Sequence, residues 1–214
     1  MNTKNQTLSS DSILIPRRLE ERDQDRLQSI YRLLQKTHIE GNLNLENIPI
    51  TNLGNLQSIR GYLDLHNTKI TDLGNLQSVG GFLDLRDTNI TNLGNLQSVG
   101  GNLWLENTKI TDLGNLTSVG GHLSLRNTKI TNLGNLQSVG SGLYLSHTPI
   151  TNLGNLQSVG SSLDLSNTPI TNLGDLTLVR GNLWLRNTPI SRLSKKERNR
   201  ILSRVKIKGE IYFD

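Results

Sequence analysis

Asp64 and Asp84 stand at equivalent places in two similar stretches, LDLHNT and LDLRDT, and His66 follows the first aspartate by two residues. Carboxylates that lie close together can share a proton or hold a cation, and glycoside-cleaving enzymes use carboxylate pairs as acid and base. Adjacent units of a repeat would bring these two carboxylates together, but on an open surface and with few further ligands. We therefore favour copying of the Asp-Leu pair within a duplicated unit over a catalytic or metal site.

No other set of reactive residues completes such a site. His38, His122 and His147 fall in different parts of the chain, so the histidines do not predict a metal cluster. The sequence has no P-loop, dinucleotide fingerprint or nucleophile motif. The absence of cysteine excludes disulfides and thiolate zinc sites. We expect a protein that is not an enzyme and that needs no cofactor.

The net charge of +5 is concentrated at one end of the chain. Residues 191–214 hold eight Lys and Arg against three Asp and Glu, whereas residues 41–190 hold eight against nine. Duplex-binding proteins usually carry a basic stripe along one face, so this distribution does not favour nucleic acid. No stretch approaches the roughly 18 consecutive apolar residues of a membrane span, and the first residues lack the apolar run of a signal peptide. We expect a cytoplasmic or virion-associated protein.

Most of the chain consists of a repeat of 20 residues, whose eight copies begin at Gly41, Gly61, Gly81, Gly101, Gly121, Ser141, Ser161 and Gly181. In the copy GNLWLENTKITDLGNLTSVG, Leu103 and Leu105 alternate as in a strand with inward side chains. The apolar residues that follow recur at every third place: Ile110, Leu113, Leu116 and Val119. That spacing is too tight for an α-helix and indicates turns or extended chain, with Asn side chains bonding the backbone at the bend. A period near 20 predicts a solenoid of stacked coils.

The pattern resembles the leucine-rich repeat, L-x-x-L-x-L-x-x-N-x-L, with Leu103, Leu105, Thr108 and Ile110 on its last four marked positions. Thr stands where that family usually has Asn, and a Gly-Gly pair replaces the regular first Leu. The S-V-G-G-x-L-x-L phrase is similar to short bacterial and phage repeats and to the receptor L-domain variety. The resemblance implies a mainly β, right-handed solenoid with one parallel sheet of about nine strands. It also implies binding rather than catalysis, because the family shares no catalytic set.

The sequences at both ends predict caps for the solenoid. We predict a mobile polar tail over residues 1–16, a capping helix over 17–38, the solenoid over 39–193 and a second cap over 194–214. Leu27, Ile30 and Leu34 have helical spacing in the first cap. In the second cap, Ser194 and Glu197 form a capping-box pattern. The stretch 209–213 aligns with 181–185 and predicts a closing strand.

Function is expected on the outward positions of the L-x-L strand. The residues there differ from coil to coil, whereas the frame of the repeat, which consists of its recurring Leu, Ile, Val and Gly residues, stays nearly constant. These positions hold five of the eight aromatic residues, and Trp, Tyr and Arg are typical anchors of interfaces. We predict that a protein partner binds this concave face. The predicted anchors and their polar neighbours are Tyr62, Phe82, Trp104, Tyr144, Trp184, His66, Arg86, His122, Arg126 and Arg186. The arginines would orient the anchors by pairing with acidic groups of the partner.

Three alternatives stay open. The aromatic residues can be tolerated there simply because they suit exposed strands. The chain can be a structural part of a larger assembly, such as a virion, docked through a basic cap of Lys195, Lys196, Arg198, Arg200 and Arg204. Single-stranded nucleic acid would use the arginines and stacking rings of the same face, but the carboxylates on that face make it a weaker candidate.

Overall fold

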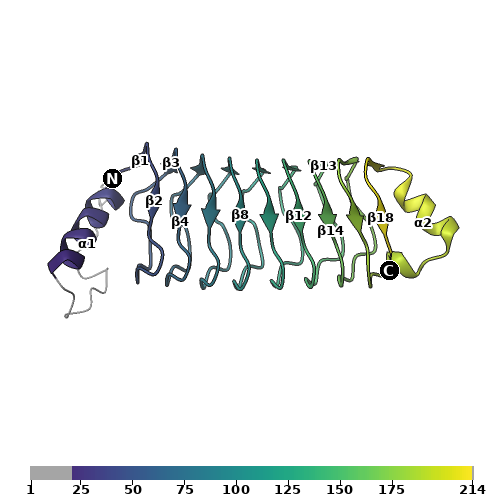
Figure 1. The fold of residues 1–214 in the computed structure, drawn as a ribbon, viewed down its shortest axis with the longest axis horizontal. Coiled ribbons are helices and arrows are strands. Elements are labelled where there is room, and N and C mark those ends of the chain that lie inside the picture. The colour runs from purple at the N-terminus through teal and green to yellow at the C-terminus, as the bar shows by residue number, and fades with distance from the viewer. Residues whose placement is uncertain (1–20, 214) are drawn as a thin grey trace, which may run out of the picture.

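The structure is a computed structural model that describes residues 21–213. The predicted tail over 1–16 and the first residues of the predicted N-terminal cap lie outside this range. The fold is a mainly β solenoid of stacked coils with one short helix at each end (Figure 1). In the described part of the chain, no helix is long and apolar enough to cross a membrane.

Each coil contributes two strands of two residues to two separate parallel sheets. The predicted sheet, here called the aromatic sheet, contains β2 (Leu43–Asn44), β4 (Leu63–Asp64), β6 (Leu83–Asp84), β8 (Leu103–Trp104), β10 (Leu123–Ser124), β12 (Leu143–Tyr144), β14 (Leu163–Asp164), β16 (Leu183–Trp184) and β18 (Ile211–Tyr212). Its strands pair in register, so Leu103 lies beside Leu123 of the next coil. The closing strand is the predicted one, because Trp184 pairs with Tyr212.

A second sheet, here called the serine sheet, was not predicted. It contains β1 (His38–Ile39), β3 (Ser58–Ile59), β5 (Ser78–Val79), β7 (Ser98–Val99), β9 (Ser118–Val119), β11 (Ser138–Val139), β13 (Ser158–Val159), β15 (Leu178–Val179) and β17 (Lys206–Ile207). Each of these strands has a single inward apolar residue, usually Val, whereas the aromatic-sheet strands lie in an L-x-L pattern with two. A single apolar residue shows no alternation, and this Val also fits the last place of the threefold row.

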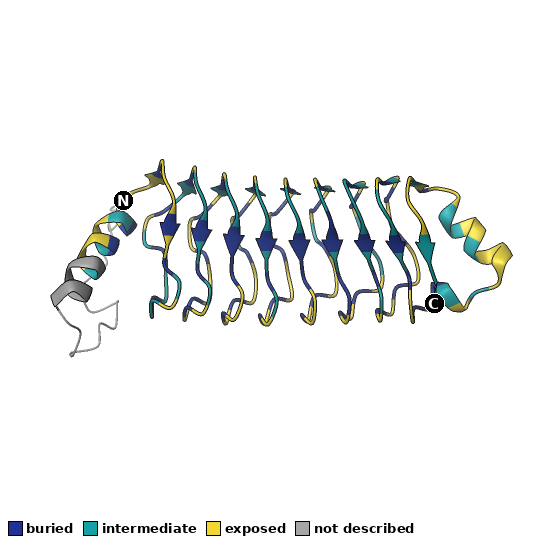
Figure 2. Cartoon of the chain, viewed as in Figure 1, coloured by how far each residue is buried: buried dark blue, intermediate teal, exposed yellow. Residues whose placement is uncertain are grey.

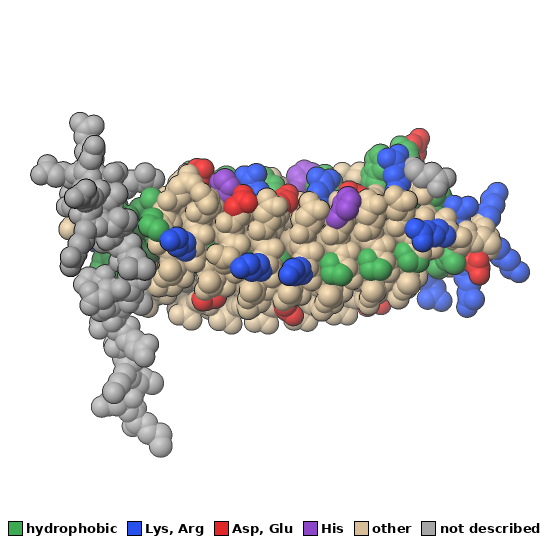
Figure 3. Space-filling view, turned by 90° about the horizontal axis from the view of Figure 1, so that it is seen from below, with side chains coloured by type: hydrophobic (Ala, Val, Ile, Leu, Met, Phe, Trp, Pro, Cys, Tyr) green, Lys and Arg blue, Asp and Glu red, His purple; other side chains and the backbone are tan. Residues whose placement is uncertain are grey.

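The coils stack along an almost straight axis (Figures 1 and 3). Both sides of each coil carry parallel strands, whose spacing is fixed near 4.8 Å by backbone hydrogen bonds. Equal spacing on both sides leaves no wedge that would bend the stack. The face predicted to be concave is therefore nearly flat along the solenoid.

The frame of the repeat supplies the core. Every inward Leu, Ile and Val from Ile50 to Ile190 is at most 4% exposed, and together they form one continuous row through the coils (Figure 2). The Thr that replaces Asn of the leucine-rich pattern is buried as well. In most coils its hydroxyl donates to a backbone oxygen three residues earlier, as Thr128 does to Leu125 at 2.7 Å.

The first seven coils each have two turns with a left-handed backbone, and the eighth has one. Gly94 has φ 55°, and the Asn92 side chain accepts its N–H at 2.9 Å. Asn95 reaches across to the Gly74 carbonyl at 3.3 Å, which confirms that the Asn side chains serve the bend. The other turn has positive φ at the position of Asn107, which is Asn, Asp or His in all eight coils. These residues tolerate that conformation better than other non-Gly residues.

The two helical caps are confirmed as elements. Helix α1 covers Glu21–Leu34, and its Ile30 and Leu34 belong to the core of the first coil. A short 3-10 helix over Ile190–Arg192 precedes α2, which covers Lys195–Leu202. The capping box is present, since Ser194 and Glu197 each accept a hydrogen bond from the other's backbone N–H.

Candidate functional site

The aromatic residues of the predicted face lie on the outer side of the aromatic sheet and form three clusters. In the first, Tyr62 and Phe82 stack with ring centroids 4.5 Å apart and an angle of 5°. Phe82 also contacts Trp104, with 5.3 Å between centroids and a tilt of 47°. All three side chains are half-buried. The in-register pairing of β4, β6 and β8 brings these residues together, although they are 20 or more positions apart in sequence.

The second cluster lies on β10 and β12, and the third lies on the last two strands. Tyr144 stacks on His122 with centroids 5.8 Å apart, and the Arg126 guanidinium lies 4.3 Å from the Tyr144 centroid. At the C-terminal end, Trp184 stacks on Tyr212 at 4.0 Å, with Arg186 4.9 Å from the Trp184 centroid. Sequence reasoning missed Tyr212 as a site residue. The alignment of 209–213 with 181–185 held the signal, since it placed Tyr212 beside Trp184.

Two of the three arginines already have carboxylate partners within the chain. Arg86 donates to both oxygens of Asp84, with Nη2 2.5 Å from Oδ2, and the hydrogen bonds to Asp84 raise the pKa of Arg86. Asp84 is only 2% exposed beneath this contact. Arg126 lies 3.7 Å from Asp164. Each arginine also contacts an aromatic ring, Trp104 or Tyr144. In this structure Arg86 and Arg126 thus each contact one ring and one carboxylate of the chain itself.

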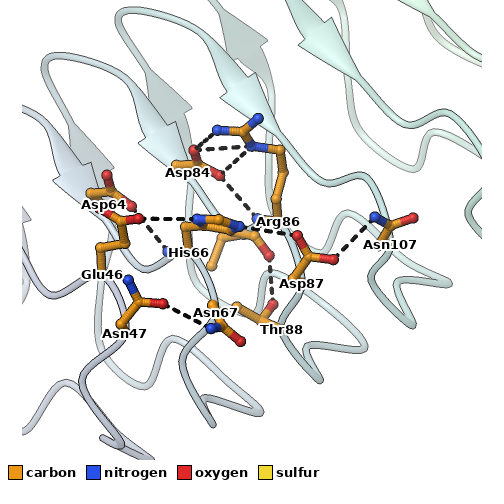
Figure 4. Close-up of polar contacts among 11 residues, drawn as sticks. Glu46, Asn47, Asp64, His66, Asn67, Asp84, Arg86, Asp87, Thr88 and Asn107 are labelled. Carbon is orange, nitrogen blue, oxygen red and sulfur yellow. Dashed lines mark hydrogen bonds and ion pairs between the residues drawn. The ribbon is translucent and has the colours of Figure 1, made fainter.

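His66 links three successive coils beside the first aromatic cluster (Figure 4). Its Nδ1 lies 3.5 Å from Glu46 and its Nε2 lies 3.0 Å from Asp87. Desolvation lowers the pKa of His66, but the hydrogen bonds to Asp87 and Glu46 outweigh it, so the net shift is upward. The protonated imidazole is therefore favoured here.

The pair Asp64 and Asp84 does lie on adjacent strands, as the repeat spacing predicts. Asp64 accepts the His66 N–H at 3.0 Å, while Asp84 faces Arg86. Partial burial raises the pKa of Asp64, and the nearby Asp84 and Glu46 add to the rise. Within residues 21–213, no group of three or more His, Cys, Asp or Glu side chains is arranged to hold a metal ion.

Several side chains that precede the first Leu of the strand serve the backbone of the next coil. Asn102 accepts the His122 N–H at 2.8 Å, and His122 Nδ1 in turn accepts the Gly142 N–H at 3.0 Å. Asn182 accepts the Glu210 N–H at 2.9 Å. This position is therefore partly structural. His122, predicted as a contact residue, is fixed between Tyr144 and the neighbouring backbone.

Two polar groups at the centre of the face have no hydrogen-bond partner in the described structure. They are the Ser124 hydroxyl, in a residue that is 4% exposed, and one buried carboxylate oxygen of Glu106. Ser124 lies between Trp104 and Tyr144 in the register of the sheet. Buried polar groups are normally paired, so these two groups are exceptions, as is the buried Thr68 hydroxyl.

The basic cap lies at the C-terminal end of the solenoid, where the Lys and Arg side chains gather in Figure 3. Lys195, Lys196, Arg200 and Arg204 are exposed. Arg198 is half-buried, with its guanidinium 4.2 Å from the Phe213 ring centroid. The structure thus separates the predicted face from the predicted basic cap.

No protein-family model matches the chain, and no curated protein matches it.

Proposed function

We propose that the chain is a leucine-rich-repeat type of binding scaffold that recognises a protein through the outer side of the aromatic sheet. The observation that carries this proposal is the gathering of six half-buried aromatic rings and three arginines on one face. Large exposed aromatic groups are unfavourable in water, and contiguous patches of them are typical of interaction sites. Aromatic rings and arginine are also the residue types that dominate binding energy at interfaces.

The internal contacts support a prepared site rather than a tolerant surface. The rings stack on one another and on arginines, so little side-chain freedom remains to be lost on binding.

Charge favours a protein over single-stranded nucleic acid. Four carboxylates, from Glu46, Asp64, Asp87 and Glu106, lie on or beside this face. Glu46 and Asp87 contact His66, and no Arg or Lys of the described residues lies within ion-pair distance of any of the four. Phosphates would be repelled by them. A partner with basic or neutral polar groups around an apolar centre would fit better.

The test is capture from native lysate with the wild-type chain, with Trp104→Ala/Trp184→Ala and with a matched control, Gln97→Ala/Gln157→Ala. The control residues are exposed and lie on the repeat frame, outside the predicted face. We expect a protein that the wild type and the control retain and the tryptophan variant loses. Each anchor should contribute about 2 kcal/mol or more to binding. Equal retention by all three chains, with circular dichroism showing each to be folded, would refute the proposal.

A further inference from the structure

The C-terminal cap covers the last coil less completely than the coils cover one another. Leu153 and Leu156 are 0% exposed beneath the following coil, whereas their counterparts Leu173 and Leu176 are 4% and 2% exposed. Beside these two leucines lies an open groove with a volume of about 510 Å³. Its walls come from the last full coil on one side and from the segment around α2 on the other.

The groove has a physical origin in the length of the final repeat. The strands β16 and β18 are 28 residues apart where other neighbours are 20 apart. The additional residues form α2. This helix lies in the part of the chain that leads from the aromatic-sheet strand β16 to the serine-sheet strand β17, where the other coils have no α-helix. A helix cannot reproduce the close stacking of a coil, and none of the residues of α2 is fully buried. Ile201 and Leu202 remain half-buried, so apolar surface is left between helix and solenoid (Figure 2).

The groove combines an apolar floor with two cations. Leu173, Leu176, Leu193, Ile201 and Val205 supply the floor. Arg200 and Arg204 line the groove too, are exposed, and take part in none of the ion pairs of residues 21–213. The one carboxylate that lines it, Glu197, accepts hydrogen bonds from the backbone N–H and the hydroxyl of Ser194. The two arginines therefore stand beside apolar surface without an ion pair to any other residue of 21–213.

We propose that this groove is a second binding site, which takes a peptide segment that carries Asp or Glu next to large apolar side chains. The apolar side chains would cover Leu193 and Ile201, the two half-buried apolar residues of the lining. The carboxylates would meet Arg200 and Arg204, whose planar guanidinium groups can donate two parallel hydrogen bonds to one carboxylate. Sites of roughly 300–1,000 Å³ hold ligands of drug size, so this volume suits a few side chains of a short segment.

The lining distinguishes this occupant from nucleic acid. None of the residues that line the groove is aromatic, so bases would find no stacking platform. Phosphate groups would use the arginines but would gain nothing from five apolar side chains. A segment with both apolar and acidic side chains uses both parts of the groove. The site lies at the end of the solenoid and is independent of the aromatic sheet.

The experiment is selection of a random dodecapeptide phage library on the full chain, with Arg200→Glu/Arg204→Glu as the counter-selection target. We expect enriched sequences in which Asp or Glu lies near Leu, Ile or Phe. The affinity of an enriched synthetic peptide, measured by fluorescence anisotropy, should fall at least tenfold in Arg200→Glu/Arg204→Glu. It should change less than twofold in Lys195→Glu/Lys196→Glu, which makes the same charge change on α2 at residues that do not line the groove.

Other outcomes would overturn the proposal. The selection could enrich no peptide, or it could enrich peptides without Asp or Glu. The two charge-reversal variants could also lose affinity for the peptide equally. Tight binding of a dT20 oligonucleotide that depends on Arg200 and Arg204, without peptide binding, would assign the groove to nucleic acid instead. Trp104→Ala/Trp184→Ala should bind the peptide like the wild type. The experiment therefore distinguishes a wrong assignment of the groove from a wrong assignment of the aromatic sheet.

Discussion

Two threonines at the same place in the repeat should respond oppositely to the same substitution. Thr68 and Thr128 are each 3% exposed. The Thr128 hydroxyl donates to the Leu125 carbonyl at 2.7 Å, whereas the Thr68 hydroxyl has no partner among the described residues. Valine has nearly the same shape as threonine but no hydroxyl. Thr128→Val therefore removes a hydrogen bond, while Thr68→Val removes only an unpaired buried polar group.

The expected changes can be worked from these contacts. The Leu125 carbonyl keeps its bond from the Thr128 N–H at 3.2 Å, so Thr128→Val leaves no orphan acceptor. The free energy of unfolding should then fall by the net value of one hydrogen bond, about 1 kcal/mol. A buried hydroxyl without a partner costs about 1 kcal/mol or more, so Thr68→Val should raise the free energy of unfolding by a similar amount. Ile48, which occupies this place in the first coil, offers the new methyl group an apolar neighbour.

Urea denaturation followed by circular dichroism, with Thr→Ser variants at both sites as controls, measures the two changes. The variants should differ by about 2 kcal/mol, the sum of the two effects, with Thr68→Val the more stable. Equal losses at both positions would refute the reasoning. That result would mean that the hydroxyl at 68 is paired in solution or that stacking of the threonine column dominates.

Gly100→Ala should lower the free energy of unfolding by about 1–3 kcal/mol, because overpacking is costly and the new Cβ would lie 2.2 Å from the Gly80 carbonyl oxygen. Gly41→Ala has no atom within 4 Å of its new Cβ and should change it by less than about 0.5 kcal/mol; urea denaturation that shows equal losses would contradict the close approach. Since the pKa of His66 is raised above its usual value of about 6.5, its protonated form stabilises the folded state. The stability difference between wild type and His66→Gln should therefore be larger at pH 5.5 than at pH 8.5, and urea midpoints that differ equally at both pH values would exclude this contribution.

The residues that share the candidate face could largely be predicted from the sequence. Strand register in a perfect repeat follows from the period, so Trp104 had to lie two strands from Tyr144 once the solenoid was recognised. That Arg86 pairs with Asp84 could not be predicted in this way. An arginine beside an aspartate and a tryptophan can face a partner or its own neighbours, and only the packed side chains show that Asp84 holds it.

The period, the inward columns, the closing strand and the capping box can all be predicted from the amino-acid sequence. Each depends either on local spacing that is repeated or on residue types with a single structural use. Three features appear only in the folded chain: the serine sheet, the hydrogen bonds that Asn102 and His122 accept from backbone N–H groups of the next coil, and the groove beside α2. Each strand of the serine sheet has a single inward apolar residue, so the sequence shows no alternation there. Contacts between coils depend on side-chain directions rather than on spacing. A groove arises from how closely a helix can approach a coil, which is a property of the packed surfaces and not of either segment.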